Sequence, residues 1–548
     1  MKRSTLWKFV GPALVAAALS VIIALALRYL LNIPMPAEIF AEQATVRIPL
    51  PLFEALLTTF GPLAKHLYLI GALVMEAALT AAAGLAYVAL RQWILSRVTR
   101  QARPWTLAWW DILGLMIWQY LLSAGLLAPL IGGGFLGAGM VGSIGGVLSA
   151  QLAPSAMFAA ALVWQVRALV NESQLAPGEG LAAIPFSRRA FIQQSATAAG
   201  LLAVGIGIWE ALTSGLGSAL GASPPSGSSP ALTLGPVPKR ITPPPTPVYG
   251  EWTAVAGQTP ELTSAADFYY VSKNLASDPA ITASSWSLSI NGMVDKPYRL
   301  TYDQLRALPT VEQYHTLECI SNTIGGNLIS NGRFVGVRLA DALNAAGIQT
   351  GANTMIFTAA DGYSDSLHLA QALDERSLIV YLLDGAPLPQ AHGYPARLLI
   401  PGLYGMKNGK WLTQLTVGGT PYTGYWEQQG WTSVAAVKMM SRIDAPHDGD
   451  LLVAQPTSIV GIAYSGANGI AEVQVSVDAG RVWNTANLRR PLGALSWTLW
   501  EYPWLPDSGQ HIIAVRAIDL DGNVQQPTVA SPLPDGASGY HAISVSVR

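Results

Sequence analysis

The chain has 548 residues, of which 51% are hydrophobic and 12% charged, and its formal net charge at pH 7 is −1. Because soluble domains usually carry about 25% charged residues, we expect part of the chain to lie in an apolar environment. The near-neutral charge, without any long basic run, argues against nucleic acid as a partner.

Residues 1–221 contain five apolar runs long enough to cross a bilayer, which takes about 20 helical residues each. The predicted spans are 9–31, 67–90, 109–131, 143–166 and 196–220. Arginine-rich segments precede the first span and separate the second from the third and the fourth from the fifth, which makes these segments cytoplasmic by the positive-inside rule. We therefore expect an α-helical, multi-pass anchor in the cell membrane, with the remainder of the chain outside the cytoplasm.

Three ionisable side chains of this region are candidates for more than anchoring. His66 is its single histidine, whereas a transmembrane haem usually needs a pair of axial ligands. Glu76 and Asp111 lie near or within predicted spans, where an ionisable group is either functional or paired with a neighbour. The sequence leaves both readings open and predicts an anchor, or a docking surface for a partner.

The segment SRRAFIQ at 187–193 precedes the last apolar run and resembles an internal twin-arginine translocation signal. The alternative is that Arg188 and Arg189 anchor the cytoplasmic end of a helix. The serine before the pair and the Phe-Ile after it favour the export reading, and we expect the last span to remain uncleaved.

Residues 222–250 are rich in proline, serine and glycine, which favours an extended linker over a packed element. Beyond it, strand-like runs such as 286–292 alternate with short helical segments such as 339–347, whose final glycine is suited to ending a helix. We expect a mixed α+β domain at 251–432.

From 433 to 548 the pattern changes to short strands separated by turns. Alternation of apolar and polar residues is clearest at 471–480 and at 511–519. Regular short strands at this spacing predict a C-terminal all-β domain of the immunoglobulin-like sandwich type. The expected fold is therefore multi-domain, with helical, α+β and all-β parts in that order.

Several motifs follow the linker in a fixed order. They are DFYYV at 267–271, INGMVDKP at 290–297, LECISN at 317–322, DGAPLP at 384–389, HGYPAR at 392–397, PGLYG at 401–405 and KW at 410–411. Together with the predicted sandwich, this series resembles the sulfite oxidase family of molybdopterin-dependent oxidoreductases, here of a membrane-anchored bacterial type. The resemblance covers 267–548 and implies that the C-terminal domain mediates dimerisation.

Cys319 is the only cysteine in the chain, so it cannot form an intramolecular disulfide. From the residue alone it is a buried apolar side chain, a nucleophile or a metal ligand. The resemblance implies that Cys319 is the protein's thiolate ligand to molybdenum, beside the two sulfurs of the pterin. A soft thiolate suits such a sulfur-rich centre, and Cys319 is accordingly both the metal ligand and a catalytic residue.

The resemblance also implies which residues hold the molybdenum–molybdopterin cofactor. They are Tyr269, Tyr270, Cys319, Asp361, His392, Arg397, Asn408, Gly409 and Lys410. Arg397 and Lys410 would bind its phosphate, because guanidinium and ammonium groups pair with phosphate oxygens. Taken singly, these two could be surface charges, and Asp361 and His392 could be turn residues; their joint order favours cofactor binding.

Two further residues are candidates for catalysis. Tyr381 matches an active-site tyrosine of animal and plant sulfite oxidases, although a core tyrosine in a strand is an equal alternative. Those enzymes carry an Arg-Asn-His run soon after the entry aromatics, whereas this chain has VSKNL at 271–275. Lys273 is the candidate substitute for the missing arginine, but it lacks the guanidinium fork.

The implied reaction is oxygen-atom transfer coupled to two electrons, with a small oxyanion or oxide as substrate. Sulfite oxidation is the first candidate, and reduction of S-oxides or N-oxides, of the methionine sulfoxide type, is the alternative. The chain lacks haem-attachment and iron–sulfur motifs, so its electrons would pass to an external cytochrome or quinone-linked protein. A non-catalytic, membrane-tethered binding or assembly protein is the alternative of a different class.

Overall fold

The computed structural model describes two compact units, Met1–Gly221 with Asn274–Ser277, and Ala222–Lys273 with Asp278–Arg548. The described residues are 3–31, 33–45, 48, 63–98, 107–131, 143–172, 188–213, 246–247, 249–250, 255–274 and 278–548. Most of the predicted linker at 222–250 lies outside these residues.

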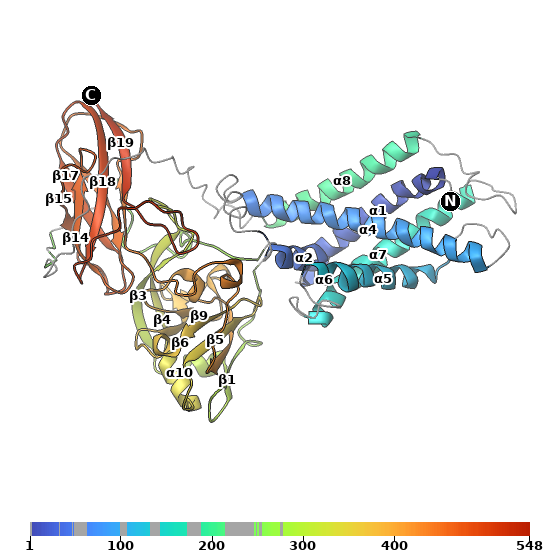
Figure 1. The fold of residues 1–548 in the computed structure, drawn as a ribbon, viewed down its shortest axis with the longest axis horizontal. Helices are drawn as coiled ribbons and strands as arrows, with labels where there is room; N and C mark the ends of the chain where they lie inside the picture. The colour runs from blue at the N-terminus through green and yellow to red at the C-terminus, as the bar shows by residue number, and fades with distance from the viewer. Residues whose placement is uncertain are drawn as a thin grey trace. The chain divides into compact units, whose positions relative to one another are not determined.

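The first unit is helical throughout its described elements (Figure 1). Its elements are α1 (Arg3–Leu31), α2 (Pro36–Thr45), α4 (Leu63–Val98), α5 (Asp111–Tyr120), the π-helix Leu121–Leu127, α6 (Ala128–Leu130), α7 (Ser143–Glu172) and α8 (Arg188–Thr213). Five helical stretches within the described residues are long and apolar enough to cross a membrane. They are Val10–Leu31, His66–Arg91, Asp111–Leu130, Val147–Ala168 and Phe191–Ile208.

The number of candidate spans is the number predicted, but the last one begins earlier than expected. The prediction started it at 196, whereas α8 already begins at Arg188 and its apolar stretch at Phe191. Helix α8 therefore includes the polar residues at 193–195 that precede the predicted start. Residues 214–220 of the predicted span lie outside the described residues.

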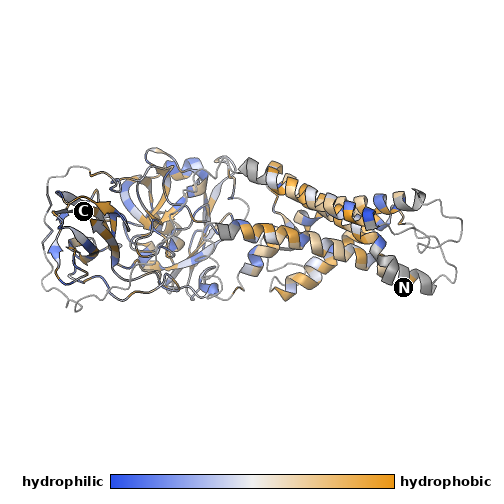
Figure 2. Cartoon of the chain, turned by 90° about the horizontal axis from the view of Figure 1, so that it is seen from above, coloured by the Kyte–Doolittle hydropathy of each residue, from blue (hydrophilic) through white to orange (hydrophobic). Residues whose placement is uncertain are grey.

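Small residues form the contact between the helices of this unit. Ala13, Ala16 and Ala17 of α1 are fully buried, and α1 packs against α4, α7 and α8. Close approach of backbones through small side chains is the usual packing mode of helices in lipid. Figure 2 shows that hydrophobic residues predominate in the middle of these helices.

Glu76 and Asp111, the two acidic side chains that the sequence singled out, both have hydrogen-bond partners. The Glu76 carboxylate accepts a hydrogen bond from the Ala37 backbone N–H at 3.0 Å. The Asp111 carboxylate accepts hydrogen bonds from the Arg91 side chain at 2.7 Å and from the Tyr87 hydroxyl at 3.0 Å. Of the two open readings for Glu76 and Asp111, the structure therefore supports pairing.

The α+β part of the second unit contains two sheets. The first has the order β2 (Tyr298–Thr301), β1 (Ser287–Gly292), β10 (Leu412–Gly418), β5 (Thr354–Ala359) and β6 (Ser364–His368). The second has the order β3 (Val311–Glu318), β4 (Ile329–Arg338), β7 (Leu378–Leu383) and β8 (Ala386–Pro387), with β9 (Arg397–Leu399) on β7. Three short helices connect the strands: α9 (Tyr302–Arg306), α10 (Leu339–Ala346) and α11 (Leu369–Ala372).

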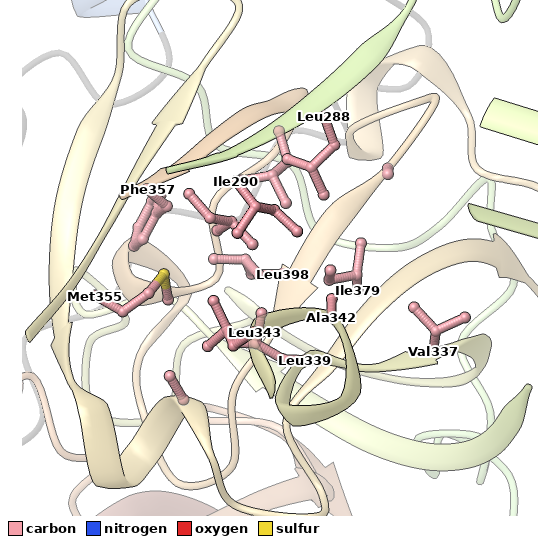
Figure 3. Packing of buried hydrophobic residues seen from close by; sticks show 14 of the residues in the cluster. Leu288, Ile290, Val337, Leu339, Ala342, Leu343, Met355, Phe357, Ile379 and Leu398 are labelled. Atoms are coloured by element: carbon pink, nitrogen blue, oxygen red, sulfur yellow. The ribbon is translucent and has the colours of Figure 1, made fainter. Parts of the chain in front are cut away.

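One large apolar core is shared by these strands and helices. Leu339 and Leu343 of α10 gather with Leu398 of β9 and with Met355 and Phe357 of β5 (Figure 3). The helix ends at Gly347, whose φ of 72° belongs to the left-handed region, as the sequence predicts. The core fixes β9, and β9 places Arg397 at its first position.

The C-terminal part is all β, in two sheets. One sheet has the order β11 (Met440–Ala445), β13 (Thr457–Tyr464), β17 (Thr498–Trp504) and β16 (Asn487–Leu488). The other has the order β12 (Leu451–Leu452), β19 (His541–Val547), β18 (Gly509–Asp519), β14 (Ile470–Ser476) and β15 (Asn484–Thr485). Alternate residues of both sheets, such as Trp500 and Val515, meet in a common core.

Within the second unit, Thr316 of β3 joins the α+β part to the sandwich. Its backbone N–H donates to the Leu495 carbonyl at 2.9 Å and its carbonyl accepts from the Tyr464 hydroxyl at 3.0 Å. Its own hydroxyl accepts from the Trp497 backbone N–H at 2.8 Å. The ion pair between Arg489 and Glu261, at 2.6 Å, adds a second link between the two parts.

Two histidines near this junction make stability depend on pH. Burial lowers the pKa of His315 to about 3 and, with Arg442 nearby, that of His541 to about 4. Both values lie below the ordinary 6.5, so the unfolded chain binds more protons than the folded one between pH 6.5 and these values. We expect the second unit to lose about 1 to 2 kcal/mol per histidine between pH 7.5 and pH 5.

Thermal unfolding of the purified full-length chain at the two pH values measures this loss. In His541→Asn the loss should be smaller than in the wild type, whereas in His447→Asn, with a side chain that is 73% exposed, it should be unchanged. Equal pH dependence of the His541 variant and the wild type would contradict the assignment.

Candidate cofactor-binding and active site

Cys319 follows directly after β3 and opens a short loop that ends at Leu328. The Cys319 backbone N–H donates to the Leu328 carbonyl at 2.9 Å and closes this loop at its base. Inside it, the Asn322 amide donates to the Glu318 carboxylate at 2.9 Å and accepts from the Leu328 N–H at 3.0 Å. The Cys319 sulfur lies 2.9 Å from the Ser321 hydroxyl. It therefore belongs to a loop that is held by several hydrogen bonds.

The surroundings of this sulfur decide between the readings that the sequence left open. Cys319 is 9% exposed, and burial raises the pKa of its thiol. A thiol with a raised pKa is a poor free nucleophile, whereas a bound metal cation favours the thiolate. The local chemistry thus fits metal ligation better than nucleophilic catalysis.

Arg397 is a buried cation whose hydrogen bonds go to backbone carbonyls. Its guanidinium donates to the carbonyls of His392 at 3.2 Å and Asn408 at 3.0 Å, and more weakly to that of Leu398 at 3.4 Å. Burial lowers its pKa to about 10. Among the described residues, no ion pair to a carboxylate is recorded for it, so an anionic group would stabilise this buried charge.

Lys410 and His392 flank Arg397. The Lys410 ammonium donates to the carbonyls of Val271 and Ala391 at 3.0 and 2.9 Å and lies 4.7 Å from the centre of the Tyr270 ring. Burial, Arg397 and Lys410 together lower the pKa of His392 to about 4, which keeps its imidazole neutral. Two cations and a neutral histidine form a donor-rich cradle.

Gly393 lies between these side chains and has a φ of 108°, which favours glycine. A Cβ atom there would lie 3.1 Å from atoms of both Arg397 and Lys410. The glycine of the HGYPAR motif therefore lets the two cations approach one backbone turn.

Tyr269 links the cradle to the thiol. Its hydroxyl lies beside Gly405, where a Cβ atom would be 2.7 Å away. Burial, followed by the nearby Cys319, raises its pKa, while Arg397 acts in the opposite direction. The ring therefore stays neutral between the predicted metal ligand and the predicted phosphate ligand.

Asn408 and Gly409 shape the backbone turn before Lys410. The Asn408 amide is used internally, accepting from the Ile400 N–H at 2.6 Å and donating to the Leu403 and Tyr404 carbonyls. A side chain at Gly409 would collide with the Phe357 ring. Both residues fix the turn that leads to Lys410.

Lys273 and Asp361, two further residues predicted for the site, lie close to each other. Their side chains are 3.8 Å apart, and the Lys273 ammonium lies 5.4 Å from the centre of the Tyr425 ring. The Tyr270 hydroxyl donates to Asp278 at 2.8 Å, and Asp361 also contributes to the raised pKa of Tyr270. Tyr270 thus connects Asp361 with Lys410.

Tyr381 is placed apart from these residues. It belongs to the large core cluster, where its ring lies edge-to-face against Tyr302 at 6.4 Å. Val380, the preceding residue of β7, packs on the other face with Leu317, close to Cys319 in sequence. Because successive strand residues point to opposite faces, the structure favours the core alternative for Tyr381.

Lys407, Asp365 and Glu427 form a buried ionic cluster that the sequence did not reveal. The Lys407 ammonium lies 2.7 Å from Asp365 and 2.6 Å from Glu427, and the three side chains are at most 7% exposed. It ties the turn before Asn408 to the segment that carries Tyr425. The only local signal was a second lysine in GMKNGK, since its partners are 42 and 20 residues away.

Comparison with known proteins identifies both parts of the second unit. Residues 275–426 match the model of the oxidoreductase molybdopterin binding domain, and residues 432–534 match the Mo-co oxidoreductase dimerisation domain. Human mitochondrial sulfite oxidase is 30% identical over 280 residues, which cover 42% of this chain and 51% of that protein. The uncharacterized oxidoreductase YuiH of Bacillus subtilis is 32% identical over 148 residues, 27% of this chain and 73% of YuiH.

Among solved structures, the sulfane dehydrogenase SoxCD of Paracoccus pantotrophus is 22% identical, with a TM-score of 0.46 over 55% of this chain and 90% of that chain. The chain spans about half the length of the mammalian sulfite oxidases that it matches.

The chain belongs to the sulfite oxidase family of molybdopterin oxidoreductases. Its cofactor is therefore the molybdenum–molybdopterin cofactor, and the residues around Cys319 and Arg397 fit that group: a buried thiol, a buried cation bonded to carbonyls, and a glycine turn between two cations.

For Arg397→Ala we expect molybdenum content to fall about tenfold or more at equal protein concentration, since hydrogen bonds to a charged group contribute about 1.5 to 3 kcal/mol each. Metal analysis of the purified protein measures the content. Arg376→Ala is the matched control, because Arg376 is 46% exposed and paired with Asp374. Full molybdenum content in the Arg397 variant would refute the phosphate-binding role.

Proposed function

We propose that the chain is a membrane-anchored molybdenum-cofactor oxidoreductase that catalyses two-electron oxygen-atom transfer outside the cytoplasm. The observation that supports this most strongly is the cradle itself. Tyr269 lies near both the buried thiol of Cys319 and the buried guanidinium of Arg397, and that guanidinium donates to the carbonyls of His392 and Asn408.

The residues of the chain have separable tasks in this proposal. Cys319 holds the metal, while Arg397 and Lys410 bind the phosphate end of the pterin. When bound, the cofactor supplies the two-electron chemistry and the site of oxygen exchange. Neutral His392 and Tyr269 add hydrogen-bonding groups without adding charge.

Sulfite is the first candidate substrate, and Lys273 is the residue proposed to attract it. An ammonium near the mouth would favour an anion. However, Lys273 lies 3.8 Å from Asp361 and over the Tyr425 ring, so its charge is partly compensated. That observation is the reason for a second candidate, reduction of a neutral S-oxide or N-oxide.

A membrane location is supported by features of the helical unit. Four exposed tryptophans, Trp93, Trp109, Trp110 and Trp164, lie near the end of α4, before α5 and toward the end of α7. Arg167 lies 5.1 Å over the Trp109 ring, so these helix ends are neighbours. Tryptophan and arginine at one end of apolar helices are typical of a cytoplasmic membrane interface.

With this topology, the second unit would lie outside the cytoplasm, where it would meet its partners. Helix α8 begins at Arg188 and would carry the chain outward, consistent with the proposed twin-arginine signal. Electrons would pass to a cytochrome or a quinone-linked protein. The match to a dimerisation domain supports a homodimer through the C-terminal part. A non-catalytic role is disfavoured because Cys319, Arg397 and Lys410 are all retained and lie in one cradle.

Electron paramagnetic resonance on protein of known molybdenum content tests the reaction. We expect a Mo(V) signal to grow when sulfite is added to the oxidised protein. If molybdenum is present but silent toward sulfite, and dithionite-reduced protein is instead reoxidised by methionine sulfoxide, the reductase assignment replaces it. Protein without molybdenum from a host that makes the cofactor would support the non-catalytic alternative.

Cys319→Ala should abolish turnover, because it removes the proposed metal ligand. Tyr381→Phe is the internal comparison: a core tyrosine predicts turnover within about threefold of the wild type, since surface and core changes that conserve shape usually have small effects. Unchanged activity of Cys319→Ala would rule out the proposed mechanism.

Protease treatment of intact spheroplasts tests the topology. We expect the second unit to be cleaved from outside, while Arg188→Lys combined with Arg189→Lys should leave it protected or absent from the membrane. Protection of the wild-type chain in intact spheroplasts, with cleavage only after lysis, would reverse the proposed orientation.

A further inference from the structure

The tip of the Cys319 loop is held by a residue of the C-terminal sandwich. Arg442, on β11, donates from its guanidinium to the Gly326 carbonyl at 2.8 Å. The same guanidinium donates to Asp444 at 2.7 Å and to the Thr259 hydroxyl at 2.8 Å. Its side chain is 12% exposed, so these three bonds form in a largely water-free setting.

The partners of Arg442 are themselves fixed. The Thr259 backbone N–H donates to the second oxygen of the Asp444 carboxylate at 3.0 Å. Arg442 and Asp444 together therefore join the segment that enters the α+β part, through Thr259, to the loop that carries the cysteine, through Gly326. Rotation of the guanidinium would break at least two charge-assisted hydrogen bonds.

A second contact from the sandwich bounds the same tip. Gly325 has a φ of 72°, and a side chain there would collide with the His541 ring. The His541 ring is oriented because its Nδ1 accepts from the Ile443 backbone N–H at 3.0 Å. His541 begins β19 and Ile443 lies on β11, so the wall against the loop belongs to the sandwich.

The loop between its tip and the thiol is short and hydrogen-bonded within itself. Only six residues separate Cys319 from Gly326, and the Gly326 N–H donates to the Thr323 carbonyl at 2.9 Å. The Asn322 N–H donates to the Cys319 carbonyl at 2.9 Å, and the Asn322 side chain ties down Leu328. The loop thus contains two short turns, 319–322 and 323–326, each closed by a backbone hydrogen bond, and the Asn322 side chain joins the first turn to Leu328.

We propose that Arg442 and His541 are positioning residues for Cys319, so that the sandwich completes the active site in addition to any role in dimerisation. The inference rests on the proposed function for the role of Cys319 as metal ligand. It assigns Arg442 a task through Gly326 rather than a contact with substrate. The C-terminal domain would then be required for the geometry of the thiol within each chain.

The reactivity of Cys319 measures how accessible its loop is, because Cys319 is the only cysteine in the chain. The experiment is alkylation of the full-length, detergent-solubilised protein, produced without molybdenum cofactor, by N-ethylmaleimide and followed by mass spectrometry. For Arg442→Ala we expect alkylation roughly tenfold faster than in the wild type, since loss of charge-assisted hydrogen bonds frees the loop. Arg442→Lys, which keeps the charge but not the fork, should lie between the two.

Arg489→Ala is the matched control. It removes a different link between the sandwich and the α+β part, the ion pair to Glu261 at 2.6 Å. We expect its alkylation rate to remain within about twofold of the wild type, as for a partly exposed pair. In cofactor-loaded protein, Arg442→Ala should also lower molybdenum content or broaden the Mo(V) signal, whereas Arg489→Ala should not.

Gly325→Ala is a second test of the same contact, in case Arg442→Ala is not recovered as folded protein. The added methyl group pushes the loop away from His541 and should also accelerate alkylation. Wild-type rates in the Arg442 and Gly325 variants would overturn the inference, and so would equal acceleration in the Arg489 control, which would indicate general loosening. Alkylation needs neither metal nor substrate. Its result therefore tests the role of Arg442 and His541 separately from the proposed reaction.

Discussion

The arrangement of the site depends on one buried guanidinium. Arg397 begins β9, packed between the large core and the His392 turn, and its donors are satisfied by backbone carbonyls of His392 and Asn408. Those bonds fix two turns, but carbonyl oxygens neutralise no charge. A buried cation without a paired carboxylate is unfavourable in isolation, so an anion would stabilise it, and the proposed function assigns that place to the phosphate of the cofactor.

Several features of the chain follow from that constraint. Gly393 is needed so that Arg397 and Lys410 can approach one turn, and Gly409 so that this turn can lie against Phe357. The side-chain amide of Asn408 stabilises the same turn through hydrogen bonds to the Ile400 N–H and the Leu403 carbonyl. Lys407, one residue before Asn408, pairs with Asp365 and Glu427, whereas Lys410 donates to the carbonyls of Val271 and Ala391. The two lysines of this segment therefore have different partners.

The second unit is better regarded as one assembly than as a catalytic domain with an appendage. Thr316 exchanges three hydrogen bonds with the sandwich only three residues before Cys319. Arg442 reaches the far end of the Cys319 loop. The segment that carries Cys319 is therefore hydrogen-bonded to the C-terminal part both before the thiol, at Thr316, and after it, at Gly326.

The sequence by itself determined the order of the helical, α+β and all-β parts and the number of candidate spans, because apolar runs and alternation are local patterns. Its site residues, taken from motifs in a fixed order, stay predictions. Tertiary structure alone decided which face of β7 Tyr381 occupies, since one residue of strand register separates the core from the Cys319 side. It also decided the pairing of Lys407 with carboxylates 42 and 20 residues away, and the reach of Arg442 across 116 residues to Gly326. Such partners have no local spacing, because the packing of distant strands creates them.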